Sequence, residues 1–136
     1  LVDQEVNLTT PEDEKRWMDN YRIPDLVLTT FEQSHYDKNE YMAGPPLVCI
    51  EIRSPNDESY EKLPFYAQLG VPEVWIIDRD SKNPEVFVLT GGAYESQAAD
   101  GDGWILSAAD GITLKAEKQK LLVRFGNETK PVMVPN

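Results

Sequence analysis

The sequence predicts a single α/β or α+β domain built on a mixed sheet, and three observations support this fold class. Apolar runs with strand-forming residues alternate with polar segments that contain glycine or proline. Two of these runs are separated by an amphipathic segment over residues 54–69, which is the pattern of a βαβ crossover. Several short strand-like runs follow residue 84, so we also expect a β-rich C-terminal extension.

The first two strands are expected at residues 22–30 and 47–53. Residues 22–30 are rich in aliphatic and β-branched side chains, and Pro24 lies near their start, where a missing N–H donor is tolerated. Residues 47–53 are almost wholly apolar until Glu51, as in a central strand that is covered on both faces. The intervening residues 31–44 have no clear period and are expected to form a loop.

A helix is expected after the second strand, and it should end at Leu69 because Gly70 and Pro72 follow directly. Pro64 is easily placed only in a first turn. Either the regular helix therefore begins near Glu61, or the turn before it is loose or kinked. The remaining strands are expected at residues 73–78, 85–90, 93–97, 112–116 and 121–125.

Length and charge limit the classes of function. The 136 residues suit one domain, and 24 acidic against 13 basic residues give a formal net charge of −11. This charge has the wrong sign for unaided attraction to phosphates; it fits a protein that binds cations, or one whose basic surface comes from a partner or an absent segment. The chain has no run of about 18 apolar residues and no signal region. We therefore expect a cytoplasmic protein with no membrane partner.

Asp25 and Glu51 are the strongest candidates for a functional site. Each lies in an apolar stretch of a different expected strand, where an ionised carboxylate is costly unless it is paired or metal-bound. Magnesium is typically held by one or two carboxylates plus substrate phosphate, so the pair fits a site in which a metal polarises a phosphate and activates water. The alternative is that Asp25 is an exposed turn residue, and that Glu51 pairs with Arg53 or another cation at the sheet edge.

Two cations could serve this acidic pair. Arg53 should share a face with Glu51 because side chains alternate along a strand, and Lys62 begins the helix that returns over the sheet. Lysine is the better candidate for orienting a water molecule, because its pKa can shift, whereas arginine remains a charged clamp. The alternative interpretation of Lys62 is a solvated lysine at a helix start.

Four segments have an order and spacing that are more specific than any single motif: IPDLVL at 23–28, PLVCIEIRSP at 46–55, EK at 61–62 with FY at 65–66, and GVPEVWIID at 70–78. From about Ile23 to Leu89 the chain resembles the bacterial restriction endonuclease-like family of the PD-(D/E)xK nuclease superfamily. The resemblance implies a restriction-endonuclease-like core with metal ligands at Asp25 and Glu51 and a basic residue at Lys62. The leading hypothesis is therefore an endonuclease that hydrolyses DNA with Mg²⁺ or Mn²⁺, in which Lys62 orients water or phosphate and Arg53 assists.

The chain departs from this family in two places. The superfamily usually has a lysine two residues after the second acid, where this chain has Arg53. Family members usually have an N-terminal helical region with a further acid, and we expect this chain to begin too late to contain it. We expect residues 1–136 to form one nuclease-like domain without that region. The alternative function is a catalytically inactive module of nuclease fold that binds a protein partner, and a homodimer is compatible with either function.

Other motifs are weaker. The Ser-x-x-Lys pattern at 59–62 lacks the partner motifs of serine acyl-transfer enzymes, and His35, the only histidine, is interpreted as a surface residue. The Asp-Gly-Asp-Gly sequence at 100–103 is interpreted as a hairpin turn, because the later ligands of a calcium loop are missing. Asp78 is interpreted as a residue of a strand-exit turn with a local ion pair.

Overall fold

The computed structural model describes residues 2–4, 6–19, 21–30, 38, 41–109 and 111–132. Its centre is a six-stranded sheet in which β6 and β7 are parallel and all other neighbours are antiparallel. In spatial order the strands are β1 (Val2–Gln4), β4 (Leu26–Leu28), β6 (Val48–Arg53), β7 (Glu73–Asp78), β8 (Pro84–Thr90) and β9 (Ala93–Ser96). The expected mixed sheet is confirmed.

The connection from β6 to β7 is the expected βαβ crossover. It contains a 3₁₀ turn, η3 (Tyr60–Lys62), which leads directly into the helix α1 (Leu63–Leu69). Pro64 lies in the first turn of α1, and Gly70 ends the helix with a φ of 89°, a left-handed conformation that glycine adopts without strain. The loose turn that Pro64 predicted is therefore η3.

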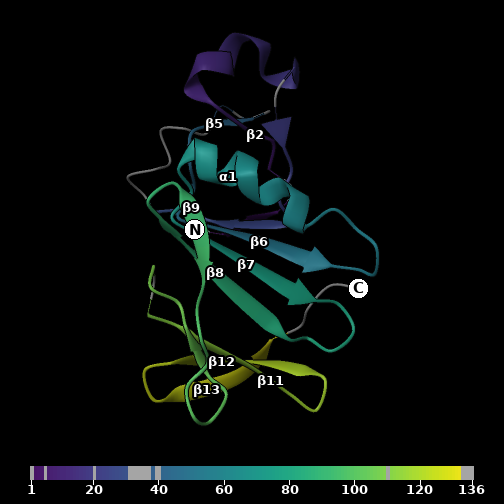
Figure 1. Cartoon of the computed structure of the whole chain (residues 1–136), viewed down its shortest axis with the longest axis vertical. Helices are drawn as coiled ribbons and strands as arrows, with labels where there is room; N and C mark the ends of the chain where they lie inside the picture. Colours follow the sequence, from purple (N-terminus) through teal and green to yellow (C-terminus); the bar gives the residue numbers. More distant parts are fainter. Residues whose placement is uncertain are drawn as a thin grey trace.

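Two smaller sheets flank the central one (Figure 1). The C-terminal sheet has the antiparallel order β10 (Ile105–Leu106), β11 (Thr113–Glu117), β12 (Lys120–Phe125) and β13 (Glu128–Val132). The N-terminal part contributes a 3₁₀ helix, η1 (Pro11–Asp19), and a sheet of β3 (Tyr21–Arg22), β2 (Leu8–Thr9) and β5 (Met42–Ala43). The β-rich C-terminal extension is thus confirmed.

The central sheet is buried on both faces, so two apolar clusters hold the layers together. Alternate residues of β6 and β7 belong to opposite clusters, as the period of two along a strand requires. On one face, Cys49 and Val74 pack with Tyr66 and Leu69 of α1. On the other, Val48, Ile50 and Trp75 pack with residues of the C-terminal sheet, Leu114 and Leu121. This arrangement explains why β6 and β7 are nearly continuous apolar runs.

Several sequence predictions need correction. The strand expected over 22–30 is limited to β4, and residues 21–22 instead form β3 of the small sheet. The loop expected over 31–44 contains β5, while residues 31–37 and 39–40, with His35, lie outside the described residues. The strands β10 and β13 were not expected, because β10 has only two residues and β13 contains charged residues and a proline. No helix among the described residues is long and apolar enough to cross a membrane.

Candidate active site

Glu51 lies in the middle of β6 and is directed to the face that α1 covers. Its side chain is almost fully buried, with the residue only 1% exposed. Its Oε1 accepts a hydrogen bond from the Tyr66 hydroxyl at 2.7 Å, and Lys62 Nζ lies 3.0 and 3.1 Å from the two carboxylate oxygens. The buried charge is therefore paired and hydrogen-bonded, which is the condition for an ionised carboxylate in an interior.

Burial and these donors act in opposite directions on the pKa of Glu51. Burial raises the pKa above its ordinary value, and the Tyr66 hydroxyl and the Lys62 charge reduce that rise. Burial, followed by the negative charge of Glu51, raises the pKa of Tyr66 well above the ordinary range. The Tyr66 hydroxyl therefore keeps its proton and remains a donor to Glu51.

A Tyr66→Phe variant tests this arrangement through the pH dependence of stability. Folding raises the pKa of Glu51, so the folded protein binds the Glu51 proton more tightly than the unfolded chain does. The resulting contribution to the free energy of unfolding is fully present below the unfolded pKa, and it is lost as the pH rises through the folded pKa. Removing the hydroxyl takes a donor from the ionised form. We expect a loss of about 1–3 kcal/mol in the free energy of unfolding at about pH 8, and a smaller loss at about pH 4.

Urea unfolding at the two pH values, without metal, measures this effect. The matched control is Tyr94→Phe, because the Tyr94 hydroxyl donates at 2.7 Å to the carbonyl oxygen of Val71, which does not titrate. Its loss should be independent of pH. Equal losses at both pH values for Tyr66→Phe would contradict the assignment.

Lys62 connects two parts of the site. It ends η3, so that its side chain and that of Tyr66, four residues later, lie on the same side of the helix. Besides contacting Glu51, Lys62 Nζ donates to the carbonyl oxygen of Ile23 at 2.9 Å. The lysine is still 27% exposed at its side chain, so it has a charged partner in the interior and access to the pocket.

Asp25 lies just before β4, and its carboxylate extends the ladder between β4 and β6. Its Oδ2 accepts a hydrogen bond from the backbone N–H of Ile52 at 2.6 Å. Pro24 lacks an N–H and cannot donate a hydrogen bond to the neighbouring strand, so regular pairing stops there. The Asp25 side chain accepts the N–H of Ile52 at this point of the ladder. Asp25 and Glu51 line the same pocket, where the charge of Asp25 adds slightly to the rise that burial causes in the pKa of Glu51.

Asp25, Glu51 and Lys62 line one open pocket of about 460 Å³. Its remaining wall is the loop that follows β6, and Asp57 fixes the shape of that loop. The backbone N–H groups of Ser54 and Ser59 donate to the two oxygens of Asp57 at 2.8 and 2.9 Å. Sequence reasoning missed the role of Tyr66, for which a tyrosine one helical turn after Lys62 was the available signal.

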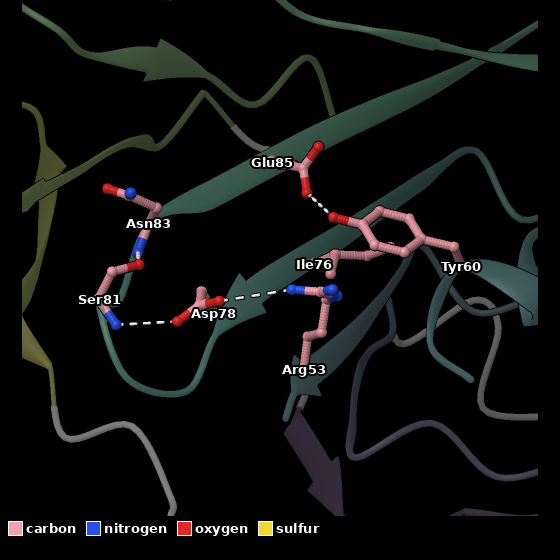
Figure 2. A pocket seen from close by; sticks show the side chains of 7 residues that line it. All are labelled: Arg53, Tyr60, Ile76, Asp78, Ser81, Asn83 and Glu85. Atoms are coloured by element: carbon pink, nitrogen blue, oxygen red, sulfur yellow. Dashed lines mark hydrogen bonds and ion pairs between the residues drawn. The ribbon is translucent and has the colours of Figure 1, made fainter. Parts of the chain in front are cut away.

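Arg53 is not among the residues that line this pocket. It lies on β6 opposite Asp78 of β7, and its Nη1 is 3.5 Å from Asp78 Oδ2. The guanidinium carbon lies 5.2 Å from the centre of the Tyr60 ring, in a neighbouring pocket (Figure 2). The structure therefore brings together Asp25, Glu51 and Lys62, and directs Arg53 to a different set of partners.

The donor set of the pocket suits a hard divalent cation. Among the described residues, no group of three or more histidine, cysteine, aspartate or glutamate side chains could hold a metal ion. Asp25 and Glu51 are two carboxylates, which is the number that magnesium uses when water and substrate phosphate supply the other oxygens. The residues present fit Mg²⁺ or Mn²⁺, and they lack the nitrogen and sulfur ligands that zinc prefers.

Two of the weaker motifs are turns, as expected. Asp78 Oδ1 accepts hydrogen bonds from the backbone N–H groups of Asp80 and Ser81, both at 2.9 Å, although its ion-pair partner is Arg53. Asp100 Oδ1 accepts from the N–H groups of Asp102 and Trp104, also at 2.9 Å. Both carboxylates are used to close turns.

Comparison with known proteins adds two findings. The model of the Uma2 family, which is described as "Putative restriction endonuclease", matches residues 3–118. A crystal structure of a protein from Anabaena variabilis ATCC 29413, described as a putative nuclease, superposes with a TM-score of 0.56 and 19% sequence identity. The alignment covers 78% of this chain and 58% of that one, so the chain spans less than two thirds of that protein. No curated protein matches the chain.

Proposed function

The chain belongs to the Uma2 family of restriction endonuclease-like proteins, and from this premise we propose that it is a metal-dependent nuclease that hydrolyses phosphodiester bonds in DNA. The observation that carries the proposal is Glu51, which is buried to 1% exposure in a central strand and yet opens with Asp25 onto a pocket. Carboxylates whose pKa is perturbed by burial cluster at functional sites, particularly where they line a pocket. The nuclease-like fold of the Anabaena variabilis protein supports the same interpretation.

In this proposal Asp25 and Glu51 hold Mg²⁺ or Mn²⁺, with Asp25 offering the oxygen that Ile52 does not occupy. Such an ion, when bound, offsets the charge of the scissile phosphate and lowers the pKa of the attacking water. Tyr66 and Lys62 hold the Glu51 carboxylate ionised and fixed in place. Lys62, which is accessible from the pocket, would also bring its positive charge close to the phosphate or the water.

The charge of the pocket makes substrate binding depend on the metal. Four carboxylates line the pocket, those of Asp25, Glu51, Asp57 and Glu58, against the single ammonium group of Lys62. The pocket without a cation therefore carries a net negative charge and repels phosphate. The formal net charge of −11 for the chain acts in the same direction. We therefore propose that DNA binds productively only with a divalent cation.

The test is cleavage of single- and double-stranded DNA with Mg²⁺ or Mn²⁺, compared between the wild type, Asp25→Ala and Glu51→Ala. The expected result is metal-dependent cleavage by the wild type that falls by about 100-fold or more in each variant. Glu95→Ala, on the exposed strand β9, is the matched control and should keep full activity. Circular dichroism confirms that each variant is folded.

Two outcomes contradict the proposal in different ways. Unchanged cleavage by both acidic variants would show that the reaction does not use this site. A folded wild type that cleaves neither substrate with either metal would favour the alternative, a catalytically inactive module of nuclease fold that binds a protein partner.

A further inference from the structure

A second pocket, of about 280 Å³, is built from the same two elements as the first (Figure 2). Arg53 is two residues beyond Glu51 on β6, and Tyr60 is two residues before Lys62 on η3. Its polar lining is completed by Asp78 at the end of β7, Ser81 and Asn83 in the following connection, and Glu85 on β8. Because two residues of a strand span about 7 Å, a ligand held in this pocket lies beside one held at Glu51.

Arg53 has hydrogen-bonding capacity that the protein does not use. Its contact with Asp78 is 3.5 Å long, which is longer than a charge-assisted hydrogen bond of about 2.7–2.9 Å. Its Nε is buried and has no hydrogen-bond partner among the described residues. Unsatisfied donors are uncommon in folded proteins, and the Arg53 side chain, which is 34% exposed, has N–H groups that remain for an acceptor on a ligand.

Tyr60 provides a rigid aromatic surface in the same pocket. The residue is 40% exposed, although its hydroxyl donates to Glu85 Oε1 and its ring meets Phe87 edge-on, with 6.5 Å between the ring centres. The Arg53 guanidinium lies over the same ring, with its carbon 5.2 Å from the ring centre. A planar group that stacks on the exposed part of this fixed ring, at little cost in side-chain entropy, therefore also meets the arginine.

The two carboxylates of the pocket decide which planar group fits. Asp78 and Glu85 repel phosphate, so they favour a neutral ligand that donates hydrogen bonds. Guanine is the nucleobase with two adjacent N–H donors on one edge and two acceptors, O6 and N7, on another. These match a carboxylate and a guanidinium, respectively.

We propose that this second pocket binds an unpaired guanine of the same strand whose phosphate lies at Asp25 and Glu51. The base stacks on Tyr60, its N–H edge faces the free oxygen of Glu85, and O6 or N7 accepts from Arg53. Since a base can enter only when it is unstacked, the substrate is single-stranded or locally opened DNA. The choice of a nucleobase as the ligand rests on the proposed function. The second pocket itself contains neither Asp25 nor Glu51, the proposed metal ligands.

The test is a titration with each of the four 2′-deoxynucleosides, followed by two-dimensional ¹⁵N NMR in the absence of metal. Deoxyguanosine is expected to shift the backbone signals of Arg53, Tyr60 and Asn83, with a Kd about tenfold lower than that of deoxyadenosine. Glu85→Gln keeps an oxygen that accepts from the Tyr60 hydroxyl, but it replaces the oxygen that faces the base with an amino group. This variant should lose the preference for deoxyguanosine. Glu95→Gln, on the exposed strand β9, is the matched control and should keep it.

The outcomes separate this inference from the proposed function. Equal affinity for the four nucleosides, or signal shifts elsewhere in the protein, would overturn the guanine site even if DNA is cleaved. Deoxyguanosine binding in a protein that cleaves no DNA would support the site and contradict the nuclease. Where cleavage occurs, a single guanine in a thymidine oligomer should direct it to the neighbouring bond in the wild type, and Glu85→Gln should abolish that selectivity.

Discussion

A Lys62→Met variant is expected to lose about 3–5 kcal/mol of its free energy of unfolding near neutral pH, together with metal-dependent cleavage. Methionine preserves much of the apolar stem but removes the ammonium group that lies 3.0 Å from Glu51 Oε1. Among the described residues, the carboxylate would then keep only the Tyr66 hydroxyl as a side-chain donor, in a site where burial already raises its pKa. Its pKa should rise further, so less of the ionised, metal-binding form remains.

Urea unfolding, with pH as the variable, checks this prediction. The loss should be largest at about pH 8 and should diminish at about pH 4, where protonated Glu51 no longer needs a cation. Lys115→Met is a matched control: the two lysines are 27% and 26% exposed at their side chains, but the partner of Lys115, Glu117, is exposed. This control should lose about 1 kcal/mol or less.

A double variant separates the ion pair from the lysine stem. Glu51→Gln removes the charge that Lys62→Met leaves unpaired, so the double variant should be more stable than Lys62→Met alone. A double variant whose losses simply add would show that Glu51 and Lys62 are not coupled, in contradiction to the contact seen here.

The sequence predicts the parts of the fold whose signals are local. β7 has the bounds expected from its apolar run, and β6 and α1 follow from an apolar run, Pro64 and Gly70. Asp25 and Glu51 stood out for the same reason, because a carboxylate in an apolar strand is conspicuous against its neighbours. The small sheet of β2, β3 and β5 gave no such signal, since strands of two residues are too short for a period.

The partners of individual side chains depend on contacts that are distant in sequence. Strand alternation places Arg53 on the same face as Glu51, but it does not show that Asp78 lies opposite Arg53 in the register of β6 and β7. Glu73 is a second example, because it was interpreted only as the first residue of a strand. Its partners in the structure are Trp75, on the same strand, and residues 107–109, which are far along the chain.

Glu73→Gln is expected to destabilise the fold by about 3 kcal/mol, without acting on the candidate site. Glu73 is 1% exposed, and four donors converge on its carboxylate. Oε2 accepts from Trp75 Nε1 at 2.6 Å and from the Ser107 hydroxyl, and Oε1 accepts from the N–H of Ala108 at 2.8 Å and of Ala109 at 3.3 Å. A glutamine amide must turn an N–H group toward one of these donor pairs, so even this isosteric change leaves buried donors unsatisfied.

Glu51 and Glu73 are thus two fully buried acids on adjacent strands with different environments. Glu73 is surrounded by protein donors and connects β7 to the segment that leads into the C-terminal sheet, whereas Glu51 opens onto a pocket. Glu73→Gln should therefore lower the urea midpoint and speed hydrogen exchange at Ala108 and Ala109, while the folded variant keeps its metal affinity and cleavage rate. A loss of metal affinity in the folded Glu73→Gln protein would show that the two acids are coupled through β7, and that burial in this sheet does not separate structural from functional carboxylates.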